Sequence, residues 1–277
     1  MDIDQVRANL DAAISVLPID ADARFTPVDA GGIRAEWTLM PGSLPSRTVY
    51  YLHGGGYVWG SPKTHRSLTA KLAAEAQARV LAVDYRLAPE HRFPAGLDDV
   101  IRGYRWLSES VASPKEIAVC GDSAGGGLAM GLLVALRDRQ LPVPACAVVF
   151  SPWADLTGES ETYVTRAAVD PILDAEGAVQ NAALYLAGAD PRGPLASPAL
   201  TDLSGLPPVL VQVGDDEVLL GDSEKLAAGI RASGGEVTLT VWKDMWHVFQ
   251  MSHASVPDAA RAVSDAGSFM KTCWRRR

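Results

Sequence analysis

The sequence predicts an α/β fold in which a mostly parallel β-sheet is covered by helices on both faces. Three observations support this prediction. Short apolar segments alternate with longer segments of helical periodicity, the connections between them are short, and 277 residues suit one large domain. A content of 48% hydrophobic and 21% charged residues is that of an ordinary globular protein, which excludes a disordered, collagenous or coiled-coil chain.

Six short segments rich in Val, Ile and Leu are expected to form strands. They are Thr48–Leu52, Val80–Val83, Ile117–Cys120, Ala145–Phe150, Val209–Val213 and Val237–Val241. Helices are expected where apolar residues recur at helical spacing, and Ser61-Pro62 is a typical signal for the start of the first. These helices are Lys63–Ala78, Pro94–Glu109, Ala124–Arg139, Asp222–Ala232 and Pro257–Thr272.

Two segments interrupt this alternation. The N-terminal segment has one apolar helical face followed by a Pro- and Gly-rich passage to Pro45. Residues 155–200 insert a helical pattern, Ala178–Leu186, between two predicted core strands. Because ligands bind at the carboxyl ends of the strands in such sheets, we expect this insertion to form a lid there. The apolar face of the N-terminal segment consists of Val6, Leu10, Ile14 and Leu17.

The charge and cysteine content exclude several classes of partner. With 25 basic and 33 acidic residues the net charge is −8, which disfavours binding to nucleic acid or to anionic membranes. The sequence contains no run of 18 apolar residues, the length needed to span a bilayer. The acidic start Met1–Asp4 is unlike a secretory signal. Three cysteines, Cys120, Cys146 and Cys273, cannot form a complete disulfide framework, so we expect buried, reduced thiols and a cytoplasmic protein.

The segment Gly121-Asp122-Ser123-Ala124-Gly125 fits the G-x-S-x-G pattern of a nucleophile elbow. It follows an apolar strand and opens a helix, which places the serine hydroxyl at the carboxyl end of the sheet, near the positive end of the helix dipole. Side chains in place of the two glycines are expected to collide with neighbouring strands. The pattern therefore predicts that Ser123 is a nucleophile.

Glycine-rich turns between a strand and a helix also bind phosphates. Gly121, Gly125 and Gly127 resemble the phosphate loop of short-chain dehydrogenases, which belongs to the first strand–helix unit of those enzymes. Here the turn follows 120 residues, and none of the seven tyrosines has a lysine four positions later, as the Tyr-x-x-x-Lys pair requires. We therefore reject a dinucleotide site.

A second glycine motif, His53-Gly54-Gly55-Gly56, directly follows the strand ending at Leu52. Glycines allow backbone N–H groups to face a cavity without obstruction by side chains. Together with the amide of Ala124 they can bind an oxyanion, and one such donor stabilises a transition state by on the order of 3 kcal/mol. The two motifs on separate strands indicate acyl-transfer chemistry.

A serine nucleophile needs a general base and an orienting carboxylate, in the chain order Ser, acid, His in this type of fold. Only His247 and His253 follow Ser123, and His247 is favoured because it lies in the loop just past the strand Val237–Val241. The strand Val209–Val213 is followed by three consecutive carboxylates, and the pattern alone does not choose among them. They are Asp215, Asp216 and Glu217.

Together these motifs resemble the hormone-sensitive-lipase-like carboxylesterases (bacterial family IV) of the α/β-hydrolase superfamily. The resemblance extends from about Val49 to Phe249. It implies an α/β-hydrolase fold with a catalytic core of residues 41–154 and 201–277 and a helical cap of residues 1–40 and 155–200. Further matching segments are Asp84–His91, Asp170–Leu173, Tyr185–Asp190, Ser197-Pro198 and the Trp246-His247 loop.

The resemblance also assigns site residues. In the family, the acid stands in an Asp/Glu-x-Leu turn followed shortly by another acidic residue. Glu217-Val218-Leu219, with Asp222 after it, fits this pattern, which favours Glu217 as the acid and leaves Asp216 as the alternative. By the same resemblance, the oxyanion amides are those of Gly55, Gly56 and Ala124.

The predicted function is hydrolysis of short- to medium-chain acyl esters by a serine carboxylesterase. His247 removes the proton of Ser123 and later protonates the leaving alcohol, and Trp59 and Tyr185 are expected to cap a small, partly apolar pocket. The alternatives are an amidase, carbamate or lactone hydrolase with the same triad, and a non-catalytic ligand receptor of the same fold. The receptor is disfavoured because such proteins typically lose the histidine.

The expected partner is a small-molecule ester, and no cofactor is expected. The histidines and cysteines lack the spacing of metal sites, so no metal is expected either. The segment 236–241 is a candidate edge strand that could pair with its copy in a homodimer.

Overall fold

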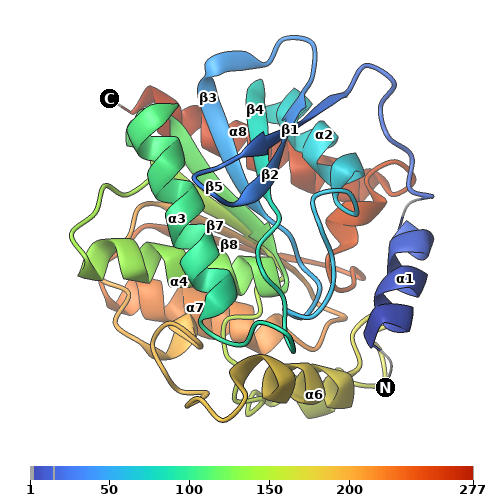
Figure 1. Ribbon diagram of the computed structural model, residues 1–277. Coiled ribbons are helices and arrows are strands. Elements are labelled where there is room, and N and C mark those ends of the chain that lie inside the picture. The colour runs from blue at the N-terminus through green and yellow to red at the C-terminus, as the bar shows by residue number, and fades with distance from the viewer. Residues whose placement is uncertain (1–2, 15, 277) are drawn as a thin grey trace.

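The computed structural model describes residues 3–14 and 16–276 and contains an eight-stranded sheet between two layers of helices (Figure 1). The strand order is β1-β2-β4-β3-β5-β6-β7-β8. The mostly parallel sheet covered by helices that the sequence predicts is confirmed. The strands are β1 (Arg24–Asp29), β2 (Arg34–Leu39), β3 (Leu44–Leu52), β4 (Ala78–Val83), β5 (Ile117–Asp122), β6 (Cys146–Phe150), β7 (Val209–Gly214) and β8 (Val237–Trp242).

All five long helices of the predicted core are present. The first begins at Arg66 instead of Lys63, because the hydroxyl groups of Ser61 and Thr64 each accept a hydrogen bond from the other residue's backbone N–H and form a turn. The helices are α1 (Ile3–Ile14), α2 (Arg66–Ala76), α3 (Ala95–Ser110), α4 (Ala124–Asp138), α5 (Thr162–Thr165), α6 (Ala175–Leu186), α7 (Leu220–Ala232) and α8 (Pro257–Arg275).

The side-chain alternation of the parallel strands creates two apolar layers. On β3, Tyr50 and Leu52 pack in one core with α3, α4 and α7, whereas Val49 and Tyr51 pack in the other with α2 and α8. All four side chains are fully buried. Strands covered on both faces need a continuous apolar sequence, which is the pattern that predicted them.

Strands β1 and β2 correct the predicted boundary of the cap. The sequence assigned residues 1–40 to the cap, but β1 and β2 pair antiparallel and β2 pairs antiparallel with β4, so residues 24–39 belong to the sheet. These short strands lack an apolar run, since they carry residues such as Pro27 and Glu36. Glu36 is tolerated in its buried position because Arg66 binds its carboxylate through two hydrogen bonds.

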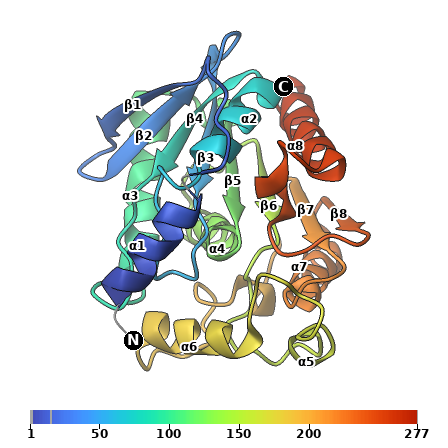
Figure 2. The same ribbon diagram turned by 90° about the vertical axis from the view of Figure 1, so that its right-hand side faces the viewer.

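The insertion crosses the carboxyl ends of the parallel strands, where Figure 2 shows α5 and α6 below the sheet with α1 beside them. Helix α6 begins three residues earlier than predicted, because the side chain of Asp174 accepts a hydrogen bond from Gly177 N at 2.8 Å and caps the helix. The site therefore has α6 on one side and the strand ends on the other.

Helix α1 has no buried residue, and Arg7 on it binds several groups of the core. Arg7 donates to the carbonyl oxygens of Val58 and Ala88 at 2.8 and 2.9 Å and binds both carboxylate oxygens of Glu90. The Arg7 hydrogen bond lowers the pKa of Glu90 to about 2, so this carboxylate stays charged well into acid. The connection joins α1 to the turn that follows the glycine motif at residues 53–56.

In the described part of the chain, no helix is long and apolar enough to cross a membrane. The three cysteines are buried and free, as the sequence predicts.

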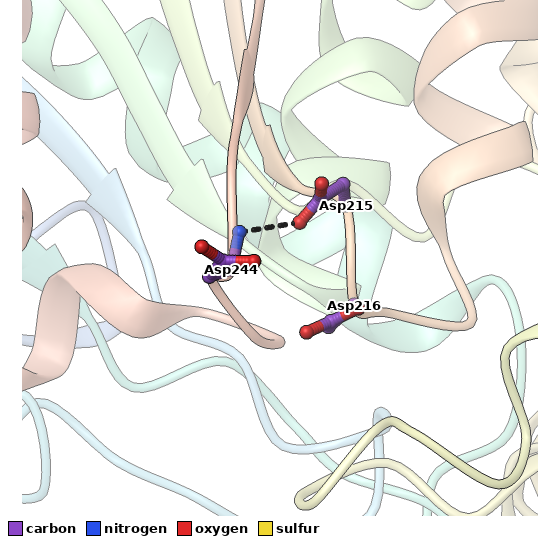
Figure 3. Close-up of side chains that lie close together, drawn as sticks. All are labelled: Asp215, Asp216 and Asp244. Carbon is purple, nitrogen blue, oxygen red and sulfur yellow. Dashed lines mark hydrogen bonds between the residues drawn. The ribbon is translucent and has the colours of Figure 1, made fainter.

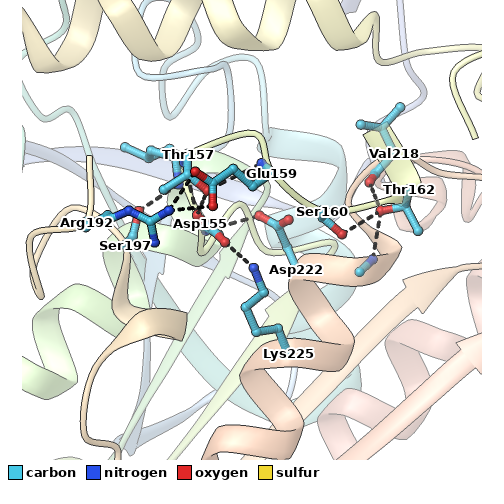
Figure 4. A network of polar contacts seen from close by, with 12 residues as sticks. Asp155, Thr157, Glu159, Ser160, Thr162, Arg192, Ser197, Val218, Asp222 and Lys225 are labelled. Atoms are coloured by element: carbon cyan, nitrogen blue, oxygen red, sulfur yellow. Dashed lines mark hydrogen bonds and ion pairs between the residues drawn. The ribbon is translucent and has the colours of Figure 1, made fainter. Parts of the chain in front are cut away.

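A buried polar network fastens the insertion to α7 (Figure 4). Asp222 accepts a hydrogen bond from Asp155 N at 3.1 Å, and Lys225 pairs with the Asp155 carboxylate. Burial, together with the neighbouring charge of Asp155, raises the pKa of Asp222 well above its usual range. A protonated Asp222 is neutral, so the Lys225 ammonium group has to balance only the negative charge of Asp155.

We expect Asp222→Asn to fold normally, because an amide has nearly the shape of a protonated carboxyl group. The native Asp222 carboxyl keeps its proton at pH values where the unfolded chain, with a pKa near ~3.9, has released it. The wild-type free energy of unfolding, relative to that of Asp222→Asn, should therefore fall as pH rises from 5 to 9. Urea unfolding at three pH values measures this difference.

Asp155→Asn is the contrasting variant. It removes the partner of Lys225 inside the network and should lose about 2–4 kcal/mol of stability at neutral pH. A difference between wild type and Asp222→Asn that stays constant across the pH range would contradict a protonated Asp222.

Candidate active site

Ser123 lies in the sharp turn between β5 and α4, with φ +51°. A Cβ atom on Gly125 would lie 2.0 Å from the carbonyl oxygen of Leu52 on β3, the collision with a neighbouring strand that the sequence predicts. A Cβ atom on Gly121 would instead meet the turn itself, 2.3 Å from the Gly125 carbonyl oxygen. Both glycines are therefore required for the position of Ser123.

His247 lies next to Ser123, and Glu217 lies on the other side of the imidazole. The Nε2 atom of His247 is 2.9 Å from the Ser123 Oγ atom, and its Nδ1 atom is 2.8 Å from Glu217 Oε2. All three side chains are buried, Glu217 completely. The structure thus brings together the serine, the histidine and one of the three consecutive acids that the sequence singles out. The other predicted histidine, His253, contacts Ser67 instead.

Opposing effects act on the pKa of His247. Burial lowers it, but the hydrogen bond and charge of Glu217 raise it, and the net result is a pKa above the usual value of 6.5. The carboxylate therefore favours the imidazolium form, which is the form that a general base reaches when it takes a proton.

The Glu217 carboxylate is fixed on its far side as well. Its Oε1 atom accepts hydrogen bonds from Ser151 Oγ at 2.8 Å and from Gly214 N at 2.5 Å. The insertion adds Asp170, whose carboxylate accepts a hydrogen bond from Val218 N at 2.9 Å. The acid loop is thus held by the sheet and by the insertion.

The alternative acid, Asp216, lies in a different environment. Its carboxylate is grouped with those of Asp215 and Asp244 (Figure 3). Within the described residues it forms no hydrogen bond to His247, whose Nδ1 atom contacts Glu217. Asp244 N donates to the Asp215 carboxylate at 2.7 Å, which ties the loop after β8 to the loop after β7. This contact brings the acid and histidine loops together.

The glycine motif lies beside Ser123. None of the hydrogen bonds between described residues uses the amides of Gly55, Gly56 and Ala124. In contrast, Gly54 N donates to the Asp122 carboxylate at 3.0 Å, and Val58 N and Trp59 N donate to the Gly55 carbonyl oxygen. The backbone of this turn is therefore fixed, while the amides of Gly55, Gly56 and Ala124 have no hydrogen-bond partner among the described residues.

Asp122 is part of the serine motif, but the sequence analysis assigned no role to its side chain. It accepts hydrogen bonds from Gly54 N and from the Tyr51 hydroxyl at 2.5 Å, and it lies 3.4 Å from His65 Nε2. Burial acts to raise the pKa of Asp122, but His65 and Tyr51 outweigh it and lower the pKa below its usual range. A buried carboxylate therefore anchors the glycine turn to the nucleophile strand.

These groups line a cavity of about 450 Å³ whose wall is mostly apolar. Trp59 lines it, as predicted, but Tyr185 does not. The ring of Tyr185 stacks on Tyr57 with centroids 3.9 Å apart, because this face of α6 packs against the core. The apolar wall includes Leu10, Ile14 and Leu17 near α1, Ile172, Leu173 and Ala178 of the insertion, and Trp153, Trp246 and Met251.

A serine, a histidine and a carboxylate in one chain of hydrogen bonds, at the carboxyl ends of parallel strands, define an α/β-hydrolase site. The family model for the alpha/beta hydrolase fold matches residues 49–251. The chain therefore belongs to the α/β-hydrolase family.

Relatives narrow this assignment. A protein named acetyl-hydrolase from Streptomyces hygroscopicus is 46% identical over 245 residues, which are 88% of this chain and 82% of the relative. A crystal structure of an esterase from the bacterial hormone-sensitive lipase family is 42% identical, with a TM-score of 0.96 and coverage of 99% of this chain and 92% of that one. A structure of EstE5 soaked by p-nitrophenyl butyrate is 43% identical, with a TM-score of 0.95 and the same coverage.

These findings confirm the resemblance to hormone-sensitive-lipase-like carboxylesterases and the predicted enzyme class, a carboxylic ester hydrolase.

The raised pKa of His247 predicts the acid limb of the pH profile. Only the neutral imidazole can accept the serine proton, so kcat/KM should fall as pH is lowered, with a midpoint above 6.5. Glu217→Gln removes the charge that raises this pKa but leaves the burial that lowers it. The midpoint should therefore move to lower pH, and kcat should fall by on the order of 10³–10⁴.

Asp216→Asn is the matched control, since it neutralises the adjacent carboxylate. It should keep the wild-type midpoint and a rate within about threefold, because the half-buried Asp216 carboxylate does not contact His247 in the described structure. The reverse pattern, with Asp216→Asn inactive and Glu217→Gln active, would assign the acid to Asp216.

Proposed function

We propose that this chain hydrolyses esters of short- to medium-chain carboxylic acids through an acyl-enzyme on Ser123. The observation that carries the proposal is the continuous hydrogen-bonded chain from Ser123 through His247 to Glu217, at the wall of an apolar cavity. Backbone amides beside the serine that have no partner among the described residues supply the donors that such a reaction needs.

The proposed reaction has two halves. His247 takes the proton of Ser123 as the hydroxyl oxygen attacks the ester carbonyl carbon, and the oxyanion accepts hydrogen bonds from the amides of Gly55, Gly56 and Ala124. His247 then donates its proton to the leaving alcohol. In the second half a water molecule, activated by the same histidine, releases the acid and restores the serine. Glu217 orients the imidazole and stabilises its charged form.

The cap sets the size of the substrate in this proposal. We assign to it α1 with the residues up to 23, and residues 155–200, since both supply apolar side chains to the cavity wall. A cavity of about 450 Å³ lies in the range of small-molecule sites, which suits an ester substrate. The relative named acetyl-hydrolase and the homologous structure soaked by p-nitrophenyl butyrate support the proposed range of acyl chains.

The same groups could hydrolyse an amide, a carbamate or a lactone, because each passes through a tetrahedral oxyanion. Esters are favoured because the relatives are named for ester hydrolysis. A non-catalytic receptor is disfavoured, since the histidine is present and lies 2.9 Å from the serine hydroxyl. The cytoplasmic location stays a prediction.

Initial rates on p-nitrophenyl esters from acetate to palmitate test the proposed activity. We expect the highest kcat/KM at short chains and a loss of about 10⁵–10⁶-fold in kcat for Ser123→Ala, because the nucleophile is removed. Ser252→Ala is the control, since Ser252 lines the same cavity and should leave kcat nearly unchanged. Wild-type protein that binds an ester analogue tightly but turns over none of these esters would favour the receptor instead.

We also propose that β8 forms a homodimer with its copy. It is the last strand of the sheet and pairs only with β7 among the described strands, and Val241 on it is 43% exposed. Light scattering at micromolar concentration should give twice the mass of the chain, and Val241→Lys should reduce it to the monomer by bringing like charges together. A wild-type monomer would exclude the dimer without affecting the proposed chemistry.

A further inference from the structure

The segment that follows β6 holds the backbone of the nucleophile. The Phe150 carbonyl oxygen accepts a hydrogen bond from Ser123 N at 2.9 Å, and Trp153 N donates to the Ser123 carbonyl oxygen at 2.9 Å. Ser151 and Pro152 lie between Phe150 and Trp153, and Ser151 is completely buried. The β6 end is therefore already in contact with one of the three reacting groups.

The Ser151 hydroxyl group reaches the other two loops of the site. Its Oγ atom donates to Glu217 Oε1 at 2.8 Å and accepts a hydrogen bond from Val248 N, directly after His247, at 3.0 Å. A hydroxyl group has one proton to donate, and here that proton is directed to the carboxylate. A single side chain thus bridges the acid loop after β7 and the histidine loop after β8.

The backbone of Ser151 has an unusual conformation for this position. Its φ is +45°, in the left-handed region that a residue other than glycine rarely adopts, and its N–H donates to the Gln212 carbonyl oxygen at 2.7 Å. A strained residue persists where its surroundings require it, and such residues concentrate at functional sites. Glycine would fit this backbone with less strain, yet it would lack the hydroxyl group.

We propose that Ser151 is a positioning residue of the catalytic acid. A glutamate side chain has one more rotatable bond than an aspartate, so its carboxylate needs contacts on both oxygens to stay in one orientation. Ser151 and Gly214 N hold Oε1, which leaves Oε2 directed at His247 Nδ1. This role rests on the proposed function of the triad and extends it, because Ser151 acts only through Glu217 and the adjacent loop.

Ser151→Gly separates positioning from structure, because it relieves the left-handed backbone while removing the hydroxyl group. We expect a melting temperature close to that of the wild type, a kcat lower by about 10–100-fold and a KM changed by less than about threefold. The acid limb of kcat/KM should also move to lower pH, since a carboxylate that rotates away no longer raises the pKa of His247. A purely structural role would not move that limb.

Two controls sharpen the test. Ser43→Gly removes another bridging hydroxyl, which donates to the Ala78 carbonyl oxygen and accepts from Met40 N far from the site, and it should keep the wild-type kcat and pH profile. In the double variant Ser151→Gly/Glu217→Gln, the loss in kcat should be close to that of Glu217→Gln alone, because the two residues act as one unit.

The outcomes distinguish this inference from the proposed function. If Ser123→Ala is as active as the wild type, the triad itself is wrong. If Ser123→Ala is inactive while Ser151→Gly keeps the wild-type kcat and pH midpoint, only the role of Ser151 is overturned. Losses that multiply in the double variant would also overturn it, since Ser151 would then act independently of Glu217.

Discussion

The site depends on the left-handed backbone of Ser123 at the point where β5 turns into α4. This conformation is costly for a serine, and the surrounding contacts maintain it: the close approach of Gly125 to Leu52, and the hydrogen bonds of Ser123 to Phe150 and Trp153. Because these contacts fix the backbone of the turn, the Ser123 hydroxyl group stays within hydrogen-bond distance of His247. The glycines on both sides are therefore a requirement of packing.

The order of the strands brings the other residues of the site close to Ser123. Because β5, β6, β7 and β8 are consecutive parallel neighbours, their carboxyl ends lie side by side, and the loops that follow them carry the serine, its supporting segment, the acid and the histidine. Ser123 and His247 are 124 positions apart in the sequence, yet the Ser123 Oγ atom and the His247 Nε2 atom are 2.9 Å apart. The sheet thus converts chain order into proximity, which is the main entropic requirement of such a reaction.

The parts of the molecule that sequence could predict are those in which a local pattern has one physical meaning. Central strands are apolar because both faces are buried, and the glycine motifs follow them directly. The strands β1 and β2 were missed because they lack an apolar run. The buried position of Glu36 on β2 depends on its pairing with Arg66, 30 positions away, which the local sequence does not reveal. Tyr185 was misplaced, since the face of α6 that meets the cavity is set by tertiary packing. The roles of Asp122 and Ser151 escaped notice because most of their partners lie in loops far away in the sequence.

The electrostatics of the site follow from the same burial. Removing His247 from water lowers its pKa, and the buried Glu217 carboxylate more than reverses this effect because little solvent screens the pair. The hydrogen bonds from Ser151 and Gly214 to the far oxygen of Glu217 keep that charge directed at the imidazole. Burial without the carboxylate would leave a histidine too weakly basic to accept a proton from serine. Apolar enclosure and a fixed carboxylate are therefore useful only in combination.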